Sequence, residues 1–66
     1  MQNQVVENIA FFRNNKWWCY IIKKVNNDYI VLEKQDGVFV EIRREKTLKK
    51  AKDYIDFYEL GSQRVD

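Results

Sequence analysis

The chain has 66 residues, which is room for one domain, 1–66, and no more. It contains one cysteine and no histidine, so an intramolecular disulfide is excluded, and we expect neither a metal site nor a cofactor. The net charge of +2 is too small to identify a nucleic-acid-binding protein by itself. The longest apolar run, residues 17–22, is far shorter than the ~20 residues of a membrane-spanning helix. Because the first residues also lack the basic and apolar segments of a signal peptide, we expect a cytoplasmic protein with no membrane partner.

The first predicted element is a helix over about residues 3–13. Val5, Ile9 and Phe12 are spaced at i, i+4 and i+7, which places them on one face of a helix. Asn14 and Asn15 follow, and asparagine readily adopts the left-handed conformation that ends many helices.

Three strands are predicted next, over about residues 17–25, 29–34 and 38–44, because these segments are rich in β-branched and aromatic residues. Turn-forming residues separate them at 26–28 and 35–37. The orientation of the first strand stays open, because either its even-numbered residues from Trp18 or its odd-numbered residues from Trp17 can face the core.

The register of the second hairpin follows from its apolar residues. A two-residue turn at Asp36 and Gly37 would place Glu33 opposite Val40 on the core face, so we predict a three-residue loop that places Leu32 there instead. The residues then expected in the core are Ile30, Leu32, Val38, Val40 and Ile42.

The last predicted element is a helix over about residues 48–60, with Thr47 as its N-cap and Gly61 just after its end. Leu48, Ala51, Ile55 and Tyr58 are spaced along one face of it. Residues 62–66 are expected to be frayed. The predicted fold is thus α+β in the order α-β-β-β-α, a three-stranded antiparallel sheet with both helices packed on one face.

The uncovered face of such a sheet is the first candidate binding surface. It is expected to carry Tyr29, Val31, Glu33, Phe39, Glu41 and Arg43 together with one of the two tryptophans. Exposed apolar area of this kind marks a contact site, and aromatic rings beside arginine stack on nucleic-acid bases or pack in protein interfaces.

The second candidate is a basic run at the start of the last helix. It consists of Arg43, Arg44, Lys46, Lys49, Lys50 and Lys52, interrupted by the single acid Glu45. Cations beside the free N–H groups of a helix start suit a phosphate. No residue pattern favours catalysis, because Cys19 has no histidine to activate it.

The segments Lys16-Trp17-Trp18-Cys19-Tyr20 and Thr47-Leu48-Lys49-Lys50-Ala51-Lys52 resemble the arm-type DNA-binding domains of tyrosine recombinases, where a similar strand and helix start flank a three-stranded sheet. The resemblance implies a sheet face that lies in the DNA major groove. The predicted element order also resembles that of the double-stranded-RNA-binding domain.

We therefore predict a small, non-enzymatic binding module. The leading hypothesis is a nucleic-acid-binding or regulatory domain in which Lys46, Lys49, Lys50 and Lys52 hold phosphates while Phe39, Arg43, Arg44 and Tyr29 make closer contacts. The alternative is a protein-binding inhibitor or adaptor that acts through the sheet face, for example a phage-encoded blocker of a host factor. A homodimer through the same face is compatible with both and would supplement a thin core.

Overall fold

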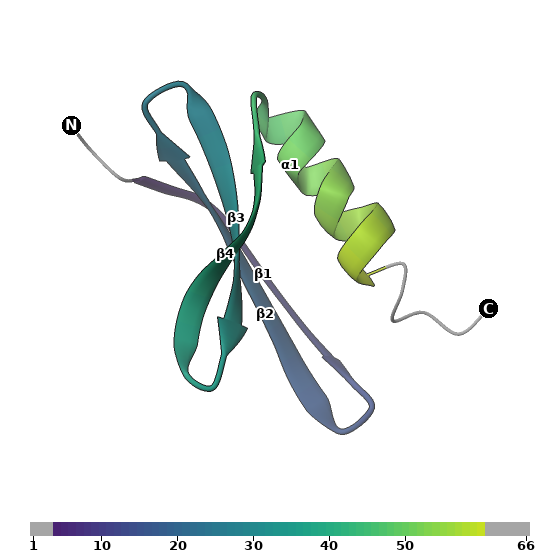
Figure 1. The fold of residues 1–66 in the computed structure, drawn as a ribbon. Coiled ribbons are helices and arrows are strands. Elements are labelled where there is room, and N and C mark those ends of the chain that lie inside the picture. Colours follow the sequence, from purple (N-terminus) through teal and green to yellow (C-terminus); the bar gives the residue numbers. More distant parts are fainter. Residues whose placement is uncertain (1–3, 61–66) are drawn as a thin grey trace.

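The computed structural model describes residues 4–60, which form a four-stranded antiparallel sheet followed by one helical segment (Figure 1). The strands are β1 (Gln4–Arg13), β2 (Lys16–Val25), β3 (Asp28–Gln35) and β4 (Val38–Glu45), and the helix α1 (Leu48–Tyr54) continues into a π-helix, η1 (Ile55–Leu60). The strands neighbour one another in chain order. The fold is α+β, but its order is β-β-β-β-α, so the predicted three-stranded sheet with a helix at each end is wrong.

The segment predicted as the first helix is strand β1. Asn14 and Asn15 both have positive φ angles, 56° and 60°, and join β1 to β2 in a two-residue turn that pairs Arg13 with Lys16. Such turns match the natural twist of paired strands. The left-handed preference of asparagine that suggested a helix end therefore serves a hairpin instead, and β1 covers the edge of β2 that a helix would have left unpaired.

The β3–β4 hairpin adopts the register with the two-residue turn, which the apolar pattern of the sequence disfavoured. Asp36 and Gly37 have φ angles of 52° and 83° and form a two-residue turn, so that Glu33 pairs with Val40. A β-bulge at Ile42 then shifts the register, and the side chains of β4 change faces beyond it. Val38 and Val40 lie opposite Gln35 and Glu33 and are 62% and 40% exposed, so the expectation that they belong to the core is wrong.

The core lies between α1 and one face of the sheet, which we call the helix face. Its fully buried residues are Tyr20, Ile22, Val31, Ala51 and Ile55. Trp18 and Leu48 pack against this cluster, so the even-numbered residues of β2 face inward and the open question about the first predicted strand is answered. Val31 was expected on the uncovered face, and that expectation is wrong.

The helix begins as predicted. The hydroxyl of Thr47 accepts a hydrogen bond from the backbone N–H of Lys50 at 3.1 Å, which caps the first turn. Ala51 and Ile55, one turn apart, are fully buried against the sheet. The predicted end of the helix at Gly61 and the frayed segment 62–66 lie outside the described residues.

Within residues 4–60, no helix has the length and apolar character needed to cross a membrane.

Candidate binding interface

The sheet face opposite α1 is covered by no other described element, and we call it the open face (Figure 1). The strand register places these apolar residues on it: Val5, Ala10, Phe12, Trp17, Cys19, Ile21, Val25, Ile30, Leu32 and Phe39. Ile21 and Ile30 are each only 8% exposed, although neither belongs to the core cluster beneath the helix. The open face is thus a second apolar layer, buried at its centre by its own neighbours.

The exposed aromatic residues of the open face lie on the two hairpin tips. Phe12 and Trp17 are 57% and 62% exposed and make an edge-to-face contact with ring centroids 5.4 Å apart. Phe39, 38% exposed, lies on the β3–β4 hairpin. The β2–β3 ladder ends at the pair Tyr20 and Glu33, and beyond it the two hairpins diverge (Figure 1). The aromatic groups therefore flank the space between two arms of the sheet.

Four of the six residues predicted for the uncovered face, Tyr29, Val31, Glu33 and Arg43, lie on the helix face instead. Tyr29 is half-buried there, and the ammonium of Lys24 lies 5.6 Å from its ring centroid. The guanidinium of Arg43 lies 5.2 Å from the ring centroid of Tyr54. Because the bulge in β4 precedes Arg43, the alternation that assigned this residue to the side of Phe39 does not hold. Of the residues predicted for the uncovered face, Phe39 and Glu41 lie on the open face, together with Arg44 of the basic run.

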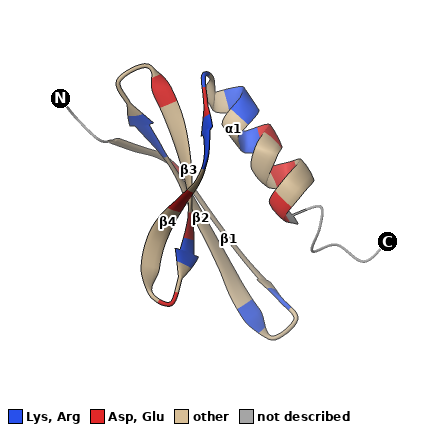
Figure 2. Cartoon of the chain, in the orientation of Figure 1, with Lys and Arg blue, Asp and Glu red and all other residues tan. Residues whose placement is uncertain are grey.

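The basic residues of β4 and the turn after it are interleaved with acids (Figure 2). The ammonium of Lys46 lies 2.8 Å from a carboxylate oxygen of Asp28, and the guanidinium of Arg44 lies 3.2 Å from the other oxygen. Hydrogen bonds from these two cations lower the pKa of Asp28 and, in turn, Asp28 raises the pKa of Arg44. Arg43 pairs with Glu45, which raises the pKa of Arg43.

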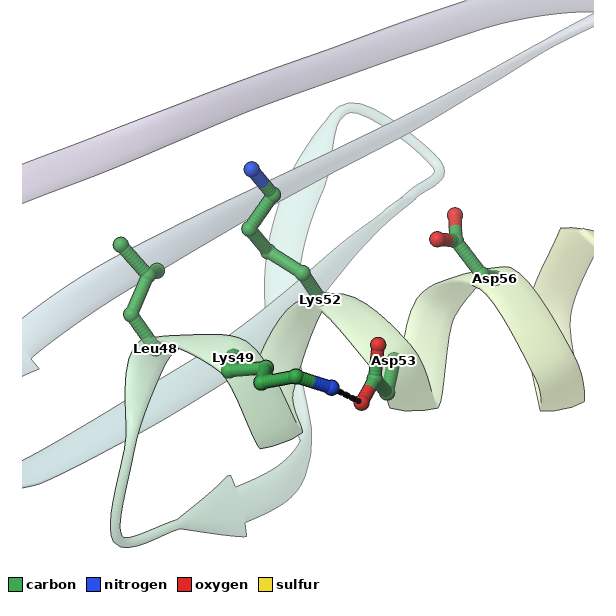
Figure 3. A pocket seen from close by; sticks show the side chains of 5 residues that line it. All are labelled: Leu48, Lys49, Lys52, Asp53 and Asp56. Atoms are coloured by element: carbon green, nitrogen blue, oxygen red, sulfur yellow. Dashed lines mark hydrogen bonds and ion pairs between the residues drawn. The ribbon is translucent and has the colours of Figure 1, made fainter.

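The helical part of the basic run is also largely neutralised. Lys49 lies 2.9 Å from Asp53 one turn along the helix, and Lys52 lies 3.5 Å from Glu7 of β1. A shallow hollow of about 390 Å³ lies beside the helix and is lined by Leu48, Lys49, Lys52, Asp53 and Asp56 (Figure 3). Since both charge signs line it, the hollow is not a cationic phosphate pocket. Five of the six predicted cations, Arg43, Arg44, Lys46, Lys49 and Lys52, together contact five acids: Glu7, Asp28, Glu41, Glu45 and Asp53.

A carboxylate clasp joins the C-terminal helical segment to the sheet. The hydroxyls of Tyr20 and Tyr54 donate to the two oxygens of Glu59 at 3.0 and 3.1 Å, and Tyr20 also lies 3.4 Å from Glu33. Burial and these carboxylates raise the pKa of Tyr20 well above its usual range, and burial together with Glu59 raises that of Tyr54. Sequence spacing carries no signal for this contact, because Tyr20 and Glu59 are distant in the chain.

Sequence reasoning anticipated some residues of the open face and missed others. Trp17 was one of two alternatives for an outward tryptophan, whereas Phe12 was missed because it had been assigned to a helix. Cys19 is a free, half-buried thiol. Among residues 4–60, no three His, Cys, Asp or Glu side chains are grouped in a way that could hold a metal ion.

Comparison with known proteins identifies no relative: no protein family, no curated protein and no solved structure matches this chain. The resemblance to recombinase arm-type domains and to double-stranded-RNA-binding domains accordingly stays a prediction.

Proposed function

We propose that this chain is a small, non-enzymatic module, an inhibitor or adaptor, that binds a partner protein through the open face of its sheet. The observation that carries the proposal is the uncovered apolar layer around Ile21 and Ile30, with Phe12 and Trp17 more than half exposed beside it. Contiguous apolar surface of this kind is uncommon on a protein that acts alone, and aromatic side chains are enriched at protein interfaces.

The charges on the open face indicate the chemistry of the partner. Arg44 is engaged by Asp28 and Glu41, whereas Lys23 and Lys34 take part in none of the ion pairs that the structure describes. The matching surface is therefore apolar at its centre with acidic groups at its rim. An acidic rim would speed association and set orientation more than it would add affinity.

Comparison of two exposed aromatic residues tests the proposal. Trp17 on the open face and Phe57 on η1 are 62% and 74% exposed, so replacing either by serine has little effect on folding. We expect nuclease-treated lysate of the source cells to yield a protein partner that binds purified wild-type chain and the Phe57→Ser variant equally well. The Trp17→Ser variant should bind that purified partner at least about 10-fold more weakly, as expected for an interface aromatic. Equal binding by all three proteins would contradict the assignment of the open face.

Nucleic-acid binding is the second candidate, and one observation favours it. Arg44 and Lys46 both contact Asp28, and the side chains of Lys46 and Lys49 remain 80% and 84% exposed. Phosphates could displace such exposed ion pairs, which contribute little energy. Titration with duplex DNA, duplex RNA and single strands, read by tryptophan fluorescence at two salt concentrations, tests it. Steeply salt-dependent binding that the Lys49→Glu/Lys50→Glu variant loses would support this candidate, whereas affinity independent of salt would contradict it.

A further inference from the structure

The outer edge of β1 is an unpaired strand edge. β1 is the first strand in the sheet order, and the contacts of α1 with the sheet are mainly with β3 and β4 at the opposite side. β4, the other edge strand, carries four charged residues among its eight, Glu41, Arg43, Arg44 and Glu45, and such charges discourage pairing with another chain. Only two of the ten residues of β1, Glu7 and Arg13, are charged. Of the two edges, β1 is thus the one open to further pairing.

The backbone groups available at this edge follow from the turn. Arg13 and Lys16 flank a two-residue turn and so form a hydrogen-bonded pair. Hydrogen-bonded and non-hydrogen-bonded pairs alternate along an antiparallel ladder. The N–H and C=O groups of Asn8, Ala10 and Phe12 consequently point away from β2, toward solvent.

The two charges of β1 are arranged symmetrically about Ala10. Beyond the bulge at Val6, pairing with β2 is regular from Glu7 to Arg13, a run whose central residue is Ala10. The acid and the base occupy the two ends of this run. Two copies of the run in antiparallel orientation, centred on Ala10, place Glu7 of each copy opposite Arg13 of the other. In this register the outward backbone groups of Asn8, Ala10 and Phe12 also meet those of the partner's Phe12, Ala10 and Asn8.

We propose that the chain forms a symmetric homodimer in which the β1 strands of two copies pair antiparallel about Ala10 and join the two sheets into one of eight strands. On the helix face, Ile9 then lies opposite the partner's Phe11, an apolar pair that adds to the two ion pairs. A parallel arrangement in register is disfavoured because it would place Glu7 against the partner's Glu7. The proposal does not depend on the function assigned to the open face.

Charge reversal on β1 tests the dimer without altering the backbone. Glu7→Arg leaves Arg opposite Arg at both ends of the interface, and Arg13→Glu leaves Glu opposite Glu. Replacing two attractive pairs by two repulsive ones should weaken dimerisation by about 10- to 100-fold in each single variant. The double variant Glu7→Arg/Arg13→Glu restores opposite charges across the interface and should recover most of the dimerisation, although it lacks the ion pair of Glu7 with Lys52 within each copy. Lys34→Glu, a charge reversal at an exposed site on β3, is the matched control and should not change the dimer.

The decisive measurement mixes the two single variants and reads the masses by native mass spectrometry and sedimentation. The Glu7→Arg chain has basic residues at both ends of the paired run, and the Arg13→Glu chain has acidic residues at both ends. A one-to-one heterodimer should therefore form on mixing, although each variant alone is monomeric. Because unfolded chains would not recover on mixing, this result separates loss of pairing from loss of folding. A wild type that remains monomeric up to about millimolar concentration would overturn the proposal. A dimer that persists unchanged in both single variants would overturn it too.

Discussion

Replacing Tyr20 by phenylalanine removes one hydroxyl from the carboxylate clasp while keeping the buried ring. The side chain is 0% exposed, and its hydroxyl donates to Glu59 at 3.0 Å. A hydrogen bond to a charged group contributes about 1.5–3 kcal/mol, so the Tyr20→Phe variant should lose about 2 kcal/mol of unfolding free energy at pH 7. Tyr58→Phe, which alters a tyrosine that is 66% exposed on η1, should change it by less than about 0.5 kcal/mol.

The same substitution should change the response of stability to alkaline pH. The pKa of Tyr20 is raised in the folded state, so its stabilising effect is complete below the unfolded pKa of about 10 and is lost as the pH rises above it. At pH 11 the unfolded wild type releases about one proton that the folded state retains, which removes about 1.4 kcal/mol. The gap between wild type and Tyr20→Phe should therefore shrink from about 2 to about 0.6 kcal/mol.

Urea unfolding at pH 7, 10 and 11, followed by circular dichroism, measures this gap. Contributions from the other ionisable groups are common to both proteins and cancel in the difference. A gap that stays constant from pH 7 to pH 11 would show that the hydroxyl of Tyr20 is not held against a carboxylate.

Three further substitutions test local features of the fold. Gly37→Ala should lower the unfolding free energy by about 1 kcal/mol through backbone strain alone, since φ is 83° and an added Cβ meets no atom within 4 Å; thermal melting measures this. Thr47→Ala should cost about 1 kcal/mol by removing the cap on α1, whereas Thr47→Ser should cost much less, in the same assay. Asp28→Asn should flatten the loss of stability in acid, because the lowered pKa of Asp28 contributes stability above its unfolded pKa of about 4 that disappears as the pH falls; denaturant unfolding between pH 7 and pH 2 tests this sign.

Strands β2, β3 and β4 and the start of α1 lie close to the segments that the sequence predicts, whereas β1 takes the place of the predicted first helix. The spacing of Val5, Ile9 and Phe12 fits a helix, yet Ile9 packs against the core and Phe12 lies on the opposite face of a strand. The bulge at Val6 interrupts the alternation that would have indicated a strand. Asparagine pairs end helices and make hairpin turns equally well, so Asn14 and Asn15 could not decide between the two.

The prediction of the register between β3 and β4 failed for a different reason. A carboxylate on the core face is unfavourable unless it is hydrogen-bonded, and this consideration argued against the two-residue turn. In the structure, Glu33 lies on the helix face but accepts hydrogen bonds from Gln35 at 3.0 Å and from Tyr20 at 3.4 Å. The sequence could not show that Tyr20 on β2 donates to Glu33, because this contact depends on how β2 and β3 pair. The basic run was similarly recognised in the sequence, while the acids that neutralise it come from β1, β3 and other distant positions.

The divergence of the two hairpins beyond Tyr20 and Glu33 has a consequence for amide hydrogen exchange. Only the middle of the sheet, residues 20–24 of β2 with 29–33 of β3, is flanked on both sides by paired strands and lies beneath the helix. Amides there should exchange only when the whole domain unfolds, whereas those near Phe12, Trp17 and Phe39 should exchange through local opening of each arm. The aromatic groups proposed to meet a partner thus belong to the least protected part of the sheet, and partner binding should slow exchange most at the hairpin tips.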